Sequence, residues 1–413
     1  MDSITAMKND MTSRERMLAA IQRQPVDHVP LGQVFHSTVF GTPPSKRWRN
    51  QFERARIMKG FGIDPVIDIW MPTPEPPPET RVRKWNEPDP DGHCPLLCAE
   101  YETPTGKLVQ KVRKTPDWYD STHHRFLPTW DGDAFRPEGG YDQLEMMDDW
   151  FTRRYKVPLV RGPEDLDKLS YLLKAPQGAA RDAWVRNALE AKRIAQEMDL
   201  LTQARRLSVG DWFMWLCLIE DFCMAMVADP AYVSRFLDIC QNYNFEILDM
   251  VLEVEPDLVQ YRGWYDTPDY WGVKRFWDAL MPRIAQLADR VHDSGLLFCY
   301  LLPEGYTLYR DHLSRMDVDV FFGLEPLAAR KTENLTLVKS VLGDKSAFWG
   351  GVNAHVTVGT GSAEEIDRAV LTAIETLGPR GFILNAAIYI SDDDVSWDRF
   401  MTFLSSWRKY GGI

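Results

Sequence analysis

The strongest constraint on the fold is a series of short apolar runs that alternate with segments of helical periodicity. In the C-terminal half these runs cover residues 296–302, 318–324, 347–352 and 381–386. Helical periodicity is found in residues 327–342 and 362–377. Nearly continuous apolar runs are typical of strands buried on both faces of a parallel sheet. Their alternation with helices predicts successive β–α units.

The N-terminal half continues the pattern. Further strands are expected near residues 30, 67, 202 and 259, which with the four runs above makes eight. Eight strands with intervening helices predict an α/β fold, a closed (β/α)8 TIM barrel, whose chemistry lies at the carboxyl ends of the strands. An open doubly wound sheet is the alternative, but no Gly-x-Gly-x-x-Gly fingerprint follows any of the strands.

One long segment interrupts the alternation. The 413 residues are interpreted as a single domain, 1–413, with a Pro- and Trp-rich insertion at residues 71–163. Inside it, residues 99–103 and 107–112 flank a Pro-Thr-Gly turn and predict a β-hairpin. We expect the insertion to cover the mouth of the barrel as a lid.

Composition narrows the possible partners and location. The chain has 48 Lys and Arg against 60 Asp and Glu, a net charge of −12, whereas nucleic-acid binding needs clustered positive charge. The N-terminal residues contain no apolar signal region, and no apolar stretch is long enough to span a membrane. Six cysteines make no dense disulfide framework. The prediction is a cytoplasmic protein that binds neither nucleic acid nor membrane.

Three metal-ligand side chains follow three successive strands. Glu304, Glu325 and His355 each lie at or just beyond the end of an apolar run, and a barrel aims such positions at one pocket. Two carboxylates and an imidazole can bind zinc and leave its fourth coordination position open for water or substrate. The alternative is that both glutamates form ion pairs or bind a polar substrate while His355 caps a loop.

Other polar side chains lie near the ends of the remaining strands. The catalytic candidates are His36, Asp68, Tyr265 and Asp266. His36 has the chemistry of a general acid, although a hydrogen-bonded loop histidine is the equal alternative. The candidates for substrate binding are Arg205, Tyr300, Asn353 and Asn385. Among them, Arg205 has the charge to hold a carboxylate.

The chain resembles the uroporphyrinogen decarboxylase superfamily. The similarity lies in residues 12–20, in Pro-Val-Asp-His-Val-Pro at 25–30, in residues 257–266, in Gly-Thr-Gly at 359–361 and in Gly-Phe-Ile-Leu-Asn at 381–385. It covers nearly the whole chain apart from the insertion and implies the barrel fold. The superfamily contains cofactor-free decarboxylases and corrinoid-linked methyltransferases on one barrel, so the fold alone does not choose the reaction.

Departures from the superfamily's patterns favour one branch. True uroporphyrinogen decarboxylases carry an arginine-rich loop after the first strand, but residues 32–38 contain no arginine. The thiol-activating methyltransferases bind zinc through His-x-Cys and a later Cys, whereas residues 298–300 and 385–387 lack that set. The corrinoid-dependent aromatic O-demethylases use two glutamates and a histidine for zinc. The resemblance therefore implies zinc at Glu304, Glu325 and His355.

The expected function is methyl transfer from a small methoxylated, possibly aromatic, substrate to a corrinoid, as in an O-demethylase. A Lewis acid at the ether oxygen would stabilise the leaving group. No Asp-x-His-x-x-Gly motif is present, so a separate corrinoid protein is the expected partner, and a homodimer is compatible with the sequence. The alternatives are a cofactor-independent decarboxylase or other lyase acting through Asp68 and His36, and a non-catalytic binder of small ligands.

Overall fold

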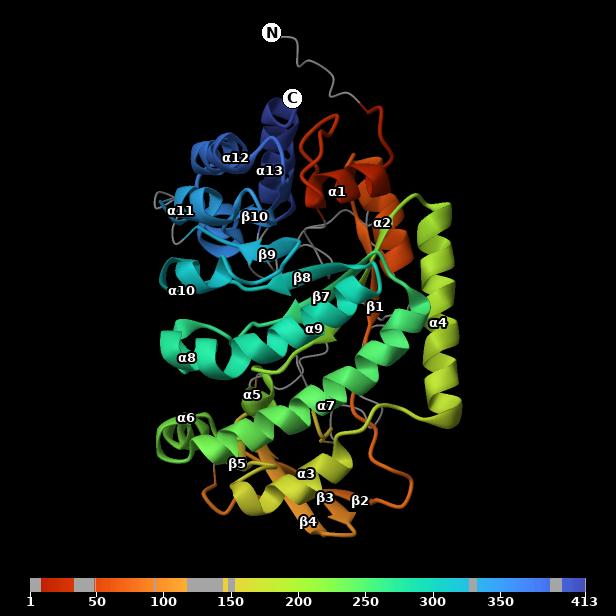
Figure 1. The fold of residues 1–413 in the computed structure, drawn as a ribbon, viewed down its shortest axis with the longest axis vertical. Coiled ribbons are helices and arrows are strands. Elements are labelled where there is room, and N and C mark those ends of the chain that lie inside the picture. The colour runs from red at the N-terminus through yellow and green to blue at the C-terminus, as the bar shows by residue number, and fades with distance from the viewer. Residues whose placement is uncertain are drawn as a thin grey trace.

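The computed structural model describes residues 9–32, 48, 50–92, 94–116, 144–147, 153–326, 333–386 and 396–412. Within them, parallel strands and helices alternate as the sequence predicts, and the helices lie around a curled sheet (Figure 1).

Seven parallel strands form the central sheet. Neighbours in the sheet are also successive parallel strands along the chain. Most residues of these strands are buried, which explains their apolar runs. The strands are β1 (Val66–Trp70), β6 (Leu201–Leu207), β7 (Leu258–Arg262), β8 (Leu297–Leu301), β9 (Val320–Leu324), β10 (Ala347–Val352) and β11 (Phe382–Ala386).

Residues 30–32 connect the two edge strands of this sheet. The Gly32 amide donates to the Leu384 carbonyl in β11 at 2.9 Å, and the Asp64 amide, just before β1, donates to the Leu31 carbonyl at 2.8 Å. Both contacts are parallel bridges. The first predicted strand is therefore present as two bridges, and its continuation lies outside the described residues. The barrel prediction is confirmed in part, as an α/β fold with a curled seven-stranded parallel sheet.

Helix α1 (Ser13–Ile21) covers the amino-terminal end of the sheet. It begins at Thr12, whose side chain accepts from the Glu15 amide while the Glu15 carboxylate accepts from the Thr12 amide, which is a capping box. The apolar face of α1 packs into one cluster with residues at the starts of the strands. That cluster includes Met17, Ala20, Ile21, Val66, Leu201, Leu258 and Ala347. Because this end is filled, a ligand must enter from the carboxyl ends of the strands.

The other helices pack around the sheet. Of these, α11 and α12 correspond to the predicted helical segments 327–342 and 362–377. The α-helices are α2 (Gln51–Gly60), α3 (Leu166–Leu172), α4 (Gly178–Glu197), α5 (Trp212–Leu216), α6 (Ile219–Ala228), α7 (Pro230–Val254), α8 (Pro268–Arg275), α9 (Met281–Asp293), α10 (Tyr306–Leu313), α11 (Glu333–Leu342), α12 (Ala363–Leu377) and α13 (Trp397–Tyr410). Short helices of other types are η2 (Pro163–Asp165), η3 (Phe276–Leu280) and η4 (Ala354–Gly359).

The insertion forms a second, antiparallel sheet (Figure 1). Its strands are β2 (Arg81–Glu87), β3 (Leu96–Thr103), β4 (Gly106–Arg113) and β5 (Tyr155–Val157). The predicted hairpin is confirmed as β3 and β4, which pair along their whole lengths. Helix α3 packs against these two strands on one side and against α7 on the other. The rest of the predicted lid, at 117–143 and 148–152, lies outside the described residues, so its position over the mouth stays a prediction.

Two further properties follow from the fold. No helix among the described residues is both long and apolar enough to cross a membrane. All six cysteines are free thiols.

Candidate active site

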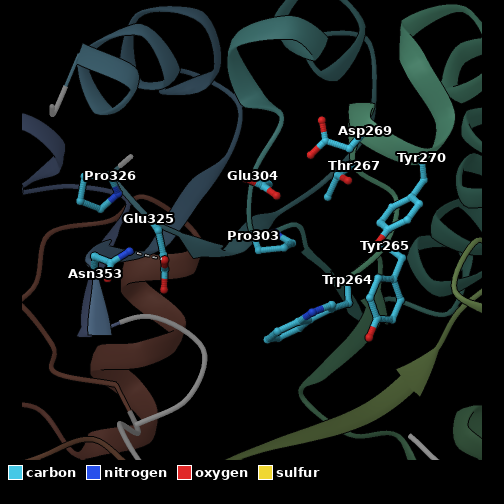
Figure 2. Close-up of a pocket in the computed structure, with 10 residues that line it drawn as sticks. All are labelled: Trp264, Tyr265, Thr267, Asp269, Tyr270, Pro303, Glu304, Glu325, Pro326 and Asn353. Atoms are coloured by element: carbon cyan, nitrogen blue, oxygen red, sulfur yellow. Dashed lines mark hydrogen bonds between the residues drawn. The ribbon is translucent and has the colours of Figure 1, made fainter. Parts of the chain in front are cut away.

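The loops that follow β7, β8, β9 and β10 enclose a pocket at the mouth of the barrel. Its volume is about 440 Å³, enough for a small molecule. Figure 2 shows three aromatic side chains on one side and Glu325 with Asn353 on the opposite side. The described lining residues are Trp264, Tyr265, Thr267, Asp269, Tyr270, Pro303, Glu304, Glu325, Pro326 and Asn353.

The two predicted glutamates line the same pocket. Glu304 and Glu325 follow β8 and β9, each next to a proline, and the parallel sheet brings these strand ends together. Asn353, the residue after β10, donates from Nδ2 to Glu325 Oε2 at 2.6 Å. The Asn353 Oδ1 atom accepts from the Val356 amide at 2.7 Å and caps η4. Asn353 therefore fixes the Glu325 carboxyl relative to the strand ends.

The environment of Glu325 disfavours its ionised form. Burial raises the pKa of Glu325 to about 7, and the nearby charge of Glu304 adds to this increase. A hydrogen bond involving the Ala354 backbone opposes it. Near neutral pH the Glu325 carboxyl is thus divided between protonated and ionised forms, which suits a group that exchanges protons or responds to a charged ligand.

Three aromatic side chains form the wall opposite Glu325. Tyr265 and Tyr270 meet edge to face, with ring centroids 5.9 Å apart and an interplanar angle of 83°. Figure 2 shows Trp264 beside Tyr265 on the same side of the pocket. Edge-to-face rings form a rigid corner, and such a corner presents both π faces and phenol groups to a ligand.

Arg262 lies behind this aromatic wall and is not among the lining residues. Its guanidinium carbon is 5.4 Å from the Trp264 ring and 5.6 Å from the Tyr265 ring. Asp211 pairs with Arg262 and also accepts from the Tyr265 amide at 2.7 Å. The Asp211 side chain is 0% exposed. Asp211 therefore balances the arginine charge and holds the backbone that carries the aromatic wall.

The interior of the barrel contains a second polar group around Asp68. Arg205 Nη1 lies 3.3 Å from Asp68 Oδ2, and Arg54 Nη2 lies 3.7 Å from the same oxygen. Arg205 Nε also donates to Gln260 Oε1 at 3.2 Å. Burial lowers the pKa of Arg54 to about 10, Asp68 opposes this, and Arg205 adds to it. The structure thus brings predicted Asp68 and Arg205 together as a buried ion pair.

Asn385 lies in the same interior. It follows Ile383 by two positions in β11, and Ile383 belongs to the interior apolar cluster, so both side chains face inward. The Asn385 Oδ1, Gln203 Nε2 and Trp349 Nε1 atoms are buried and have no hydrogen-bond partner in the structure.

Tyr300 and Asp266 lie together outside the pocket lining. The Tyr300 hydroxyl donates to Asp266 Oδ2 at 3.0 Å, and both residues are fully buried. Tyr300 packs in the core cluster between sheet and helices, because it alternates with Cys299 and Leu301, which face the interior. Burial raises the pKa of Asp266 well above its usual range, and Asp211 adds to this effect. Asp266 is thus a buried group of the core, and of the predicted pair only Tyr265 reaches the pocket.

The family comparison matches the part of the chain that builds this site. Residues 214–397 match the uroporphyrinogen decarboxylase (URO-D) family, and this segment contains every described lining residue. The part of the chain that builds the pocket is therefore similar to this family. No curated protein matches the sequence.

One solved structure matches nearly the whole chain, and others match part of it. A methyltransferase from Methanosarcina mazei is 14% identical, with a TM-score of 0.57, over 96% of this chain and 98% of that chain. A B12-independent methionine synthase from a Shewanella species is 11% identical, with a TM-score of 0.36, over 55% and 65% of the two chains. A D-psicose 3-epimerase from Clostridium cellulolyticum is 10% identical, with a TM-score of 0.33, over 60% and 93%.

Two of the three zinc ligands expected from the sequence lie at this pocket, and the third does not. Glu304 and Glu325 supply two oxygen ligands at one pocket, but His355 is exposed in η4 and is not among the lining residues. No group of three or more His, Cys, Asp or Glu side chains in the described ranges has the geometry to hold a metal ion. Zinc therefore stays a prediction, and no chemical step below depends on it. His36 lies outside the described residues.

Several residues of the pocket and its surroundings are absent from the sequence prediction. They are Trp264, Thr267, Asp269, Tyr270, the two prolines and the Asp211 and Arg262 pair behind the wall. The aromatic cluster directly after residues 258–262 was a usable signal, because residues following a barrel strand line the mouth. The Asp211 contact joins residues 51 positions apart and leaves no local pattern.

Proposed function

We propose that this protein is a methyltransferase that moves a methyl group from a small methylated donor to a corrinoid on a separate protein. The proposal rests on the match of residues 214–397 to the uroporphyrinogen decarboxylase family and on the likeness of fold to a methyltransferase over 96% of the chain. The observation that carries it is the pocket at the barrel mouth, where an aromatic wall faces a carboxyl group with a pKa of about 7.

The residues of the pocket have separate roles in this proposal. Tyr265, Tyr270 and Trp264 bind the apolar part of the donor and exclude water. Glu325 holds a proton near neutral pH, and it can donate this proton to an oxygen that loses its methyl group. Asn353 orients the Glu325 carboxyl through the 2.6 Å hydrogen bond. A reduced corrinoid supplies the nucleophile when bound.

A methoxylated aromatic donor, expected from the sequence, is one candidate for this pocket. Phenolate is a poor leaving group, so proton donation from Glu325 would lower the barrier to loss of the methyl group. The aromatic wall would stack against such a donor.

The proposed reaction is tested by mixing the purified protein with free cob(I)alamin and a panel of methylated donors. We expect loss of the Co(I) absorption, with demethylated donor appearing in equal amount by chromatography. Glu325→Gln should slow turnover, since a positioned acid contributes about 10²- to 10⁴-fold to rate. Glu375→Gln removes a similar charge on the exposed side of α12 and is the matched control. Release of CO₂ from a carboxylated substrate without corrinoid would establish the decarboxylase alternative instead.

A further inference from the structure

The described surface of the pocket carries acidic side chains without basic ones. Its lining contains three carboxylates, Asp269, Glu304 and Glu325, and no described lysine, arginine or histidine. The nearest identified cation behind the wall, Arg262, is already paired with the buried Asp211 carboxylate. A neutral or anionic ligand would leave the repulsion between Glu304 and Glu325 in place, whereas a cationic ligand would relieve it.

The aromatic wall has the complementary chemistry for the same kind of ligand. The π faces of Trp, Tyr and Phe attract cations, and cages of such rings bind quaternary ammonium groups. Tyr265 and Tyr270 provide two rings at 83° to each other, and Trp264 lies beside them (Figure 2). Methylated onium groups are too large and too weakly hydrated for tight carboxylate hydrogen bonds, so rings together with nearby negative charge suit them better than carboxylates alone.

We propose that the methyl donor is a methylated onium compound, a quaternary ammonium or sulfonium, held between the aromatic corner of Tyr265 and Tyr270 and the carboxylates of Glu304 and Glu325. The statement that this ligand donates a methyl group rests on the proposed function. The recognition of a methylated cation stands on the geometry and charge of the pocket.

Methyl transfer from an onium donor requires no proton donor for the leaving group. The carbon to nitrogen or carbon to sulfur bond breaks, and its electron pair stays on the heteroatom, which leaves as a neutral amine or sulfide. The methyl carbon accepts the electron pair of Co(I), so the cobalt is oxidised to Co(III) and no proton is consumed. An onium donor therefore needs no Lewis acid.

The recognition step is tested without corrinoid by isothermal titration calorimetry on the full chain at pH 8. Choline is the cationic probe, and 3,3-dimethyl-1-butanol is its neutral isostere of the same shape. We expect choline to bind at least about tenfold more tightly than the isostere, because one cation–π contact or one relieved charge is sufficient for a tenfold change. Equal binding of the two probes, or binding of neither, would overturn the inference.

Paired variants assign the effect to the two walls of the pocket. Tyr270→Leu removes a ring and should weaken choline binding about tenfold, whereas Tyr270→Phe keeps the ring and should bind within about threefold of the parent protein. Glu325→Gln should weaken choline binding about tenfold without changing isostere binding, and Glu375→Gln should change neither. Thermal unfolding of each variant identifies loss of fold. Choline binding that survives both Tyr270→Leu and Glu325→Gln in folded protein contradicts the assigned site.

The proposed function and the onium donor can fail separately. Selective choline binding with no methyl transfer from any onium donor to cob(I)alamin would remove the methyltransferase proposal and keep the cation site. Methyl transfer from a neutral methoxylated aromatic, with no preference for choline over its isostere, would support the methyltransferase proposal and overturn the onium donor.

Discussion

The Asp211 carboxylate pairs with Arg262 directly behind the aromatic wall of the pocket, and the same carboxylate accepts from the Tyr265 amide. One buried acid thus balances the arginine and fixes the loop that carries Trp264 and Tyr265. Asp211→Ala should lower the free energy of unfolding by about 3–5 kcal/mol, because it removes the buried carboxylate that balances the Arg262 charge. Chemical denaturation measures this change.

A second variant separates the charge from the shape of Asp211. Asp211→Asn keeps a hydrogen-bond acceptor for the Tyr265 amide but loses the charge, so we expect a smaller loss of stability than for alanine. It also leaves Arg262 unneutralised near the pocket, which should weaken binding of a cationic probe. If Asp211→Asn is as stable as the parent and binds choline equally well, the ion pair has no influence on the pocket.

The pKa of Glu325 predicts a pH-dependent effect on stability. In the folded protein this pKa is about 7, against 4.5 for an ordinary glutamate. Between these pH values the folded protein retains a proton that the unfolded chain has lost, so the Glu325 contribution to stability falls as pH rises through this window. Glu325→Gln lacks this titration. Its melting temperature relative to the parent should therefore rise from pH 4.5 to pH 7 and then level off, as differential scanning fluorimetry would reveal.

The same titration separates the two donor classes. An ether donor needs the protonated carboxyl of Glu325, so its turnover should fall as pH rises above about 7. A cationic ligand is attracted by the ionised carboxyl, so its affinity should rise over the same range. Because Glu304 and Asp269 also face the pocket, the comparison is made with Glu325→Gln, which should flatten whichever profile is observed.

The zinc prediction is tested by elemental analysis of protein purified without chelators. If zinc is held by Glu304, Glu325 and His355, the protein should contain about one zinc per chain. Glu325→Gln and His355→Ala should then each lower the affinity about 10- to 100-fold, whereas Asp269→Asn should not. Protein with full activity and no zinc would exclude this site. Unchanged zinc in His355→Ala would exclude His355 as a ligand and agree with its exposed position.

The buried ion pair of Asp68 predicts a structural cost that must be separated from any catalytic role. Asp68→Ala leaves Arg54 and Arg205 without their shared carboxylate inside the barrel. We expect a loss of about 3–5 kcal/mol in the free energy of unfolding. A folded Asp68→Asn protein that has lost CO₂ release from a substrate would support the decarboxylase alternative. Retained methyl transfer by that variant would limit Asp68 to a structural role.

Local sequence patterns predicted much of the fold because the relevant signals are local. The α1 capping box lies within four residues, and the hairpin of β3 and β4 turns at a Pro-Thr-Gly sequence. The runs that became β8, β9, β10 and β11 are buried on both faces and therefore apolar throughout. Helix α10 was missed because it is short and follows directly after a pocket loop, and α13 follows a segment, 387–395, that carries no helical signal.

The candidate site was less predictable because it depends on contacts between distant segments. Position after a strand was sufficient to place Glu304, Glu325 and Asn353 at one pocket. It was insufficient for Tyr300, whose side chain points to the helical layer, since a one-residue change along a strand reverses the face. Asp266 lies in the loop after β7 and is held by the Tyr300 hydroxyl, a contact between distant segments. The raised pKa of Glu325 depends on burial and on Glu304, neither of which is visible in the sequence around it.

The contacts of residues 28–32 have a consequence for folding during synthesis. The Val29 amide donates to the Gly411 carbonyl, the Trp407 indole donates to the Val29 carbonyl, and the Gly32 amide donates to Leu384. Each partner is made more than 350 residues after the segment that it holds. The N-terminal segment therefore lacks these three partners until the ribosome has made the C-terminal part of the chain. Chaperones that protect exposed strand edges would act on this protein until β11 and α13 have emerged.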